Sequence, residues 1–174
     1  MNSKNEVITT ILNRRSIRKF NNQKINDDDL KILAECAIHA PSGMSKDLWY
    51  FAVINNQGLI DELVSIMKRL LDNDKYDMYC PKALIISANK KDNSHGIEDN
   101  ACALENIFIA ARSMNIGSVW INQVRHYMED EELRAYLLRV GIDESMNVYG
   151  VAALGYYDEE PNIKKRLGKY NIYS

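Results

Sequence analysis

Apolar residues recur at intervals of three and four along five segments of the chain, which is the spacing of one face of an α-helix. One segment begins after a good N-cap, Asn26, carries three aspartates in its first turn, and stops before Pro41. The fourth segment is long and has further small and apolar residues around its apolar face, so we expect a helix buried on more than one side. The pattern predicts helices over residues 6–12, 27–38, 59–70, 97–114 and 130–138.

Four shorter apolar runs lie between these helices and have the length of buried β-strands. They cover residues 49–54, 83–88, 116–121 and 148–154, and the second is apolar enough to be covered on both faces. Helices that alternate with such strands predict an α+β fold, a layered mixed sheet with helices on its faces. The pattern does not show which strands are parallel. No repeat or linker interrupts it, so residues 1–174 are interpreted as one domain.

The composition is that of a globular protein, with 46% hydrophobic and 26% charged residues in 174. The longest stretch without a charged side chain, residues 48–60, is shorter than the roughly 20 apolar residues that span a bilayer. The first six residues lack the apolar core of a signal peptide, and three scattered cysteines form no disulfide framework. We therefore expect a reduced, cytoplasmic protein. His39, His95 and His126 show no ligand spacing, so no metal site is predicted.

Basic residues gather at the two ends of the chain. Residues 1–24 and 161–174 together hold ten basic side chains and one acidic, a net +9, whereas residues 25–160 hold 12 basic and 23 acidic, a net −11. An acidic body argues against a nucleic-acid surface, which needs a broad basic face. Two compact basic clusters fit a small anionic ligand if folding brings the ends together. The alternative is that both clusters are solvated termini.

The first basic cluster contains a candidate phosphate site. Three arginines and a hydroxyl lie within five residues in the string Arg14-Arg15-Ser16-Ile17-Arg18. The arginine fork matches phosphate oxygens and serine adds a short neutral donor, so the mixture suits a phosphoryl group better than a carboxylate. An ordinary charged surface string is the alternative.

Three further segments carry candidate chemistry at the ends of predicted elements. In residues 40–46, a Pro-Ser-Gly turn allows backbone to approach a flat ligand closely. In residues 117–124, a strand ends in Trp and polar side chains, and an indole beside backbone donors could lie against a heterocycle. Residues 155–161 lead from the last strand into the second basic cluster. The alternative for residues 40–46 is an ordinary helix-to-strand connection, and for residues 117–124 it is a tryptophan in the core. For residues 155–161 the alternative is a disordered tail.

In order and spacing, these four segments resemble the nitroreductase family of flavin mononucleotide (FMN) enzymes. The pattern is Arg-Ser-x-Arg-x-Phe, then Ala-Pro-Ser-Gly, a long helix leading to Gly-Ser-x-Trp-Ile, and finally Leu-Gly-Tyr, an acidic turn, Pro and Lys-x-Arg. The resemblance implies a nitroreductase-like fold and an FMN-dependent oxidoreductase that takes hydride from NADH or NADPH. A small acceptor, such as a nitroaromatic or a quinone, would then be reduced by a ping-pong mechanism. It also implies a homodimer with the active site at its interface. From the acidic body and the lack of a long apolar stretch, we expect neither nucleic acid nor a membrane as partner.

The resemblance further implies a role for each matching residue. The flavin carries the chemistry, so no catalytic side chain is expected beyond an electrostatic role for Arg18. The C-terminal tail, about residues 158–174, would complete the cofactor site or the dimer. The cofactor-binding residues would be Arg14, Arg15, Ser16 and Arg18 with Lys164 and Arg166 around the phosphate and nearby flavin atoms, Pro41, Ser42, Gly43 and Ser45 from the neighbouring subunit, and Trp120, Ile121, Asn122 and Gln123 beside the isoalloxazine ring.

Two departures from the family pattern affect the loop that would reach the flavin. Ser45 stands where an asparagine is usual, and Asp47-Leu48 replaces Gln-Pro. Because serine is shorter than asparagine, it cannot make the same hydrogen bond to the ring edge. A non-catalytic flavin-binding or sensing protein is therefore a second hypothesis. A basic-ended interaction module is a third, which the acidic body disfavours.

Overall fold

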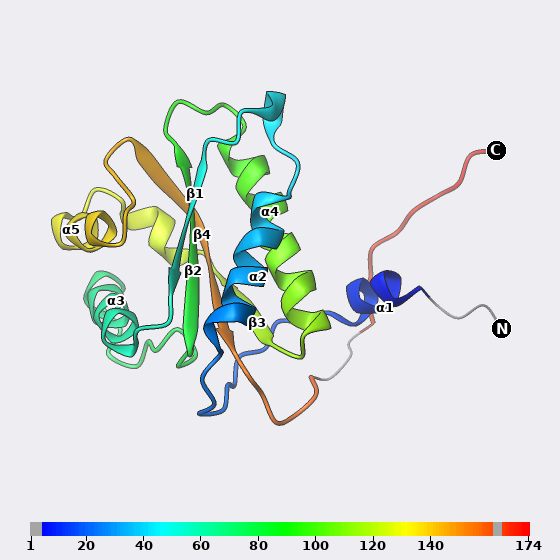
Figure 1. Ribbon diagram of the computed structural model, residues 1–174, viewed down its shortest axis with the longest axis horizontal. Helices are drawn as coiled ribbons and strands as arrows, with labels where there is room; N and C mark the ends of the chain where they lie inside the picture. Colours follow the sequence, from blue (N-terminus) through cyan, green and yellow to red (C-terminus); the bar gives the residue numbers. More distant parts are fainter. Residues whose placement is uncertain (1–4, 162–164) are drawn as a thin grey trace.

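The computed structural model describes residues 5–161 and 165–174 and is built around one four-stranded antiparallel sheet (Figure 1). The strands are β1 (Trp49–Ile54), β2 (Ala83–Lys90), β3 (Gly117–Ile121) and β4 (Met146–Gly155), in the order β1-β2-β4-β3. All three strand pairings are antiparallel. Within the described residues, the parallel component of the predicted mixed sheet is limited to an isolated bridge between Ser118 of β3 and Ser16, which belongs to no strand.

Helices cover both faces of this sheet, which confirms the α+β class. In Figure 1, α3 and α5 lie on one face, α2 and α4 lie on the other, and α1 lies beyond α4. Every predicted helix and strand is present, with ends that differ by at most two residues. The helices are α1 (Glu6–Asn13), α2 (Asp27–Ile38), α3 (Gln57–Leu70), α4 (Gly96–Ser113) and α5 (Glu131–Arg139), with short 3₁₀ turns η1 (Gly43–Ser45) and η2 (Gln123–Tyr127).

The two faces of the sheet form separate hydrophobic cores, and β2 contributes to both. Leu84 and Ile86 belong to the core beneath α3 and α5, whereas Ala83 and Ile85 belong to the core beneath α2 and α4. This alternation follows from the two-residue period of a strand. The prediction that this strand is covered on both faces is confirmed.

The segment that follows α1, residues 14–21, lies along the outer edge of β3 and is called the N-terminal segment below. Ile17 donates its backbone N–H to the carbonyl of Ser118 over 2.9 Å, and the Ile17 side chain is buried. An uncovered edge strand presents unpaired backbone groups, so this segment protects the edge locally. It also places Ser16 and its arginine neighbours beside the strand that carries Trp120.

Helix α1 has an apolar face that the rest of the described chain does not cover. Val7, Ile8, Ile11 and Leu12 are all exposed, and no residue of the helix is buried. The tail, residues 165–174, leaves the body on the same side of the molecule (Figure 1). Among the described helices, none is long and apolar enough to cross a membrane.

Candidate functional site

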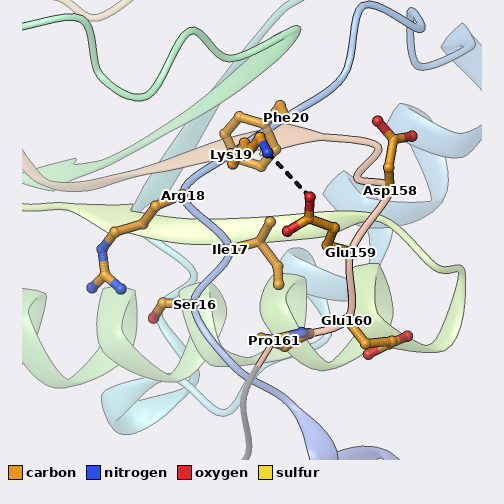
Figure 2. Close-up of a pocket in the computed structure, with 9 residues that line it drawn as sticks. All are labelled: Ser16, Ile17, Arg18, Lys19, Phe20, Asp158, Glu159, Glu160 and Pro161. Carbon is orange, nitrogen blue, oxygen red and sulfur yellow. Dashed lines mark hydrogen bonds and ion pairs between the residues drawn. The ribbon is translucent and has the colours of Figure 1, made fainter.

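The N-terminal segment contacts the residues that directly follow β4, numbers 156–161, which form the strand exit. Asn21 donates its backbone N–H to the Tyr156 carbonyl over 2.7 Å and its side-chain amide to Asp158 over 2.8 Å. Lys19 forms a 3.2 Å ion pair with Glu159. Head and tail of the domain are therefore neighbours at least as far as Pro161. Between them lies a cavity of about 330 Å³, lined by residues 16–20 and 158–161 (Figure 2).

The charges around this first cavity do not favour an anionic ligand. Three carboxylates line it against two cations. Glu159 already pairs with Lys19, and Glu160 accepts a hydrogen bond from Arg112 at 3.1 Å. Arg18 points away from the acidic turn, as Figure 2 shows. A phosphate site of the kind that the sequence predicts would therefore lie elsewhere along the same segment.

A second cavity, of about 180 Å³, joins two of the candidate segments. The first segment contributes Arg14 and Ser16, and the third contributes Ser118 and Trp120. Helix α4 forms the remaining wall with Glu105 and Phe108, and Val119 completes the lining. This cavity combines the arginine and hydroxyl of the first segment with the indole of the third.

Arg14 is held at the wall of the second cavity by two groups of α4. Its Nε lies 3.3 Å from the Glu105 carboxylate, and its guanidinium carbon lies 6.0 Å from the centre of the Phe108 ring. Within the described residues, no hydrogen bond occupies either Nη of Arg14, so both terminal nitrogens can donate to a ligand. Phe108 in turn contacts Trp120, with ring centres 6.1 Å apart.

The other two arginines have different neighbours. Arg15 turns back onto α1 and donates to the carbonyls of Leu12 and Arg14 at 2.8 and 2.6 Å. These bonds satisfy carbonyls that the end of a helix leaves free. Arg18 is exposed, and its guanidinium carbon lies 5.7 Å from the centre of the Tyr79 ring.

The predicted loop lies at a different place, at the N-terminal end of α4. Gly43 donates its N–H to Asp99 over 2.7 Å, and the Ser42 hydroxyl donates to Asp47 over 2.6 Å. Pro41 and Ser45 are exposed. None of these loop residues lines either cavity described above. Within one chain the loop does not join the Arg14 site.

The strand-end segment presents its side chains in several directions. Trp120 is 37% exposed and lies on the α4 side of the sheet, whereas Ile121 is buried in the core beneath α3 and α5. Only the backbone of Ile121 is therefore free to approach a ligand from the Trp120 side. The Gln123 side chain accepts the N–H of Asn122 at 3.1 Å, and the Asn122 amide lies 3.3 Å from His126.

The second basic cluster lies beyond the strand exit. Arg166 is exposed, and no hydrogen bond or ion pair within the described chain joins it to Arg14. Lys164, the other predicted member, lies outside the described residues. Where the chain is described, there is also no group of three or more His, Cys, Asp or Glu side chains arranged to hold a metal ion.

A half-buried tyrosine anchors the strand exit on α4. Tyr157 accepts a hydrogen bond from Arg112, which also binds Glu160. Burial is the main cause that raises the pKa of Tyr157, so the phenol stays neutral at physiological pH. The exit of β4 is thus fixed to the same helix that holds Arg14.

Sequence reasoning missed four residues that shape this region: Tyr79, Asp99, Glu105 and Phe108. Phe108 falls within the helix predicted over residues 97–114, where it counts only as an apolar residue. Glu105 precedes it by three positions and so shares its face, a spacing that could have indicated a charged neighbour. Tyr79 contacts Arg18, and Asp99 accepts the N–H of Gly43. Both contacts depend on how distant loops fold, which residue type alone does not reveal.

The architecture is that of solved nitroreductases. A nitroreductase with bound FMN from Bacteroides fragilis has 35% identity and a TM-score of 0.86 over 98% of each chain. An FMN-dependent nitroreductase from Clostridium difficile shares the fold, with a TM-score of 0.82 and 24% identity over 98% of this chain and all of that one.

Sequence comparison agrees. The profile of the Nitroreductase family matches residues 11–156, so the chain belongs to the nitroreductase family. A relative in Vibrio harveyi, named NADPH-flavin oxidoreductase, is 26% identical over 180 aligned residues, which cover 94% of this chain and 70% of that protein. A protein of Archaeoglobus fulgidus that carries the name NADH dehydrogenase/NAD(P)H nitroreductase is 28% identical, over 95% of this chain and 94% of its own length.

Proposed function

We propose that the chain is an FMN-dependent oxidoreductase that oxidises NADH or NADPH and reduces a second small molecule. The observation that carries this proposal is the cavity shared by Arg14, Ser16 and Trp120, in a chain 35% identical to a nitroreductase that binds FMN. Bound FMN would supply the chemistry by accepting hydride from the nicotinamide and passing electrons to an acceptor such as a nitroaromatic or a quinone.

The side chains at this cavity fit the parts of FMN. The free fork of Arg14 and the Ser16 hydroxyl supply charged and neutral donors for a phosphate group. The partly exposed indole of Trp120 offers a flat apolar surface for a ring. Lys164 and Arg166 are further candidates for the phosphate, and Ile121, Asn122 and Gln123 for the ring edge.

A homodimer would complete the site. The Arg14 cavity, of about 180 Å³, is smaller than the roughly 300–1,000 Å³ of typical ligand pockets. The loop Pro41–Ser45 lies elsewhere in the same chain, so it would have to serve the site of a second copy. The exposed apolar face of α1 supplies a surface for that copy. The tail after residue 158 carries further exposed apolar side chains that would add to it: Leu167, Tyr170, Ile172 and Tyr173.

One ring face must stay open for donor and acceptor to bind in turn, which predicts ping-pong kinetics. The residues of this chain then act by holding the cofactor and by adjusting the charge around it. Arg18 would stabilise negative charge at the pyrimidine edge. No side-chain nucleophile or general base is assigned.

The test is direct. Purified protein should be yellow or should bind added FMN, it should lose its flavin absorbance on anaerobic addition of NADH or NADPH, and it should sediment as a dimer. Protein that neither contains nor binds FMN would overturn the proposal. Bound flavin that neither nucleotide reduces would favour the non-catalytic binding or sensing protein that the Ser45 and Leu48 departures suggest.

A further inference from the structure

Ser118 lies in β3, and its side chain faces α4. Successive side chains of a strand alternate between the two faces of the sheet. Val119 and Ile121 belong to the core beneath α3 and α5, whereas Trp120 contacts Phe108 of α4. The Ser118 side chain therefore lies on the same face of the sheet as the indole.

The hydroxyl of Ser118 has no partner among the described residues. Ser118 is only 3% exposed, and no described side-chain hydrogen bond satisfies its hydroxyl, although its carbonyl accepts the N–H of Ile17 at 2.9 Å. Native proteins rarely leave a buried hydroxyl unpaired, because such a group loses its hydrogen bonds to water and gains none. The unsatisfied hydroxyl therefore indicates that a ligand group binds at this position.

The open space beside Ser118 is the Arg14 cavity. The residues that line it include Ser118 and Ser16, which the isolated bridge pairs side by side. Paired residues of neighbouring strands direct their side chains to the same face of a sheet. Two serine hydroxyls therefore join the guanidinium of Arg14 around a space of about 180 Å³.

These donors fit a phosphate better than a carboxylate. Glu105 occupies the Nε of Arg14 at 3.3 Å, so the two Nη nitrogens are the arginine donors that remain for a ligand. A carboxylate has two oxygens, which one guanidinium fork satisfies, whereas a phosphate ester has three. The serine hydroxyls can donate to the oxygen that the guanidinium leaves free.

We propose that Ser118 is a cofactor-binding residue whose hydroxyl donates to the phosphate of FMN, beside Arg14 and Ser16. The inference rests on the proposed function, because FMN is the ligand that supplies this phosphate. Ser118 binds the cofactor and takes no part in proton or hydride transfer. It adds a donor that a strand of the sheet holds in place, whereas the other donors come from the N-terminal segment.

The experiment measures the dissociation constants of FMN and riboflavin for wild type, Ser118→Ala and Ser113→Ala by fluorescence titration. We expect FMN to bind about 10- to 100-fold more weakly to Ser118→Ala, which loses one hydrogen bond to a charged group. Riboflavin lacks the phosphate and should bind to this variant as it does to wild type. Ser113→Ala removes an exposed hydroxyl that donates to Ala110 in the same helix, and should change neither constant.

Thermal unfolding separates the effect on binding from an effect on folding. Without flavin, Ser118→Ala should be at least as stable as wild type, because it removes a buried hydroxyl that lacks a partner. The stabilisation that FMN adds should be smaller in the variant, since this stabilisation depends on the affinity. A purely structural role of Ser118 would instead lower the stability by the same amount with and without FMN, and would reject the inference.

The outcomes separate this inference from the proposed function. If wild type binds FMN and Ser118→Ala binds it equally well, or loses affinity for FMN and riboflavin alike, the inference fails and the proposed function stands. If Ser118→Ala does not fold, Ser118→Cys replaces it, because the thiol is only a weak donor. Weaker binding of FMN alone then supports the inference, and unchanged FMN binding rejects it. Wild type that binds no FMN would refute the proposed function and this inference with it.

Discussion

The backbone N–H of Gly43 donates a 2.7 Å hydrogen bond to the carboxylate of Asp99, which is buried in the first turn of α4. The other oxygen of Asp99 accepts a 2.9 Å bond from the Asn93 amide. A Cβ at Gly43 would lie 2.5 Å from the His95 ring, so only glycine fits this close approach. The loop that the family pattern associates with flavin is therefore fixed by α4.

Replacement of Asp99 by asparagine should release this loop. An amide has one oxygen, so either Gly43 or Asn93 would face a second donor instead of an acceptor. Leaving one buried donor unpaired costs about 1–3 kcal/mol, and urea unfolding measures this loss. If the loop reaches the flavin of a second copy, FMN affinity should fall as well.

Asp47→Asn is the matched control, because its exposed carboxylate accepts the Ser42 hydroxyl in the same loop. We expect it to change the free energy of unfolding little. Equal stability of Asp99→Asn and wild type would contradict the structural role of Asp99.

Arg14 should contribute to affinity through the phosphate alone. In Arg14→Ala we expect FMN binding to weaken by about 1–3 kcal/mol, the value of a charge-assisted hydrogen bond. Riboflavin has the same ring without the phosphate, so its affinity should be unchanged. Isothermal titration of both ligands separates the two contributions. A similar loss for riboflavin would instead indicate that the variant disturbs the ring site through Phe108 and Trp120.

The elements of the fold were predictable because their signals are local. Asn26 caps α2 through its side chain as expected, and the continuous apolar run of β2 reflects burial on both faces. Strand pairing was not predictable, since a run of apolar residues does not identify its partner. The wholly antiparallel order of the named strands therefore emerged only from the structure.

In the candidate site, too, local features were predictable and distant contacts were not. Arg14 and Trp120 were found from their residue types and from family order, and the structure brings both to one cavity. Arg15 belongs to the same string, yet it binds the end of its own helix. Contacts with distant parts of the chain decide whether an arginine of this string lines the cavity or binds the end of α1. A local sequence pattern contains no information about such contacts.

Asp130 should make the stability of α5 depend on pH. It caps the helix by accepting the N–H of Leu133 at 2.9 Å, and it pairs with Arg69 at 2.7 Å. The hydrogen bond from Arg69 is the main cause that lowers the pKa of Asp130. A carboxyl with a lowered pKa stabilises the fold above its unfolded pKa, about 3.9, and that contribution disappears as the pH falls through the folded value.

Two variants separate the charge from the cap. Asp130→Asn keeps a good cap and removes the charge, so its difference from wild type in urea midpoint should be present at pH 7 and should shrink as the pH falls below the unfolded pKa of about 3.9. Asp130→Ala loses both, and at pH 7 it should lower the free energy of unfolding by about 1 kcal/mol for the cap alone. A pH-independent difference for Asp130→Asn would rule out the ion pair as its source.

Gly150 should control the position of Trp120. It lies in β4 beneath the indole, and a Cβ there would come within 2.6 Å of the Trp120 ring nitrogen and 2.8 Å of Leu104. Gly150→Ala must therefore displace the indole, which lines the Arg14 cavity, or the Leu104 side chain. We expect altered tryptophan fluorescence, weaker FMN binding and a loss of about 1–3 kcal/mol in stability from overpacking. Gly58→Ala, in the first turn of α3, is the control and should leave FMN affinity unchanged. Wild-type affinity in Gly150→Ala would show that the flavin does not rest on Trp120.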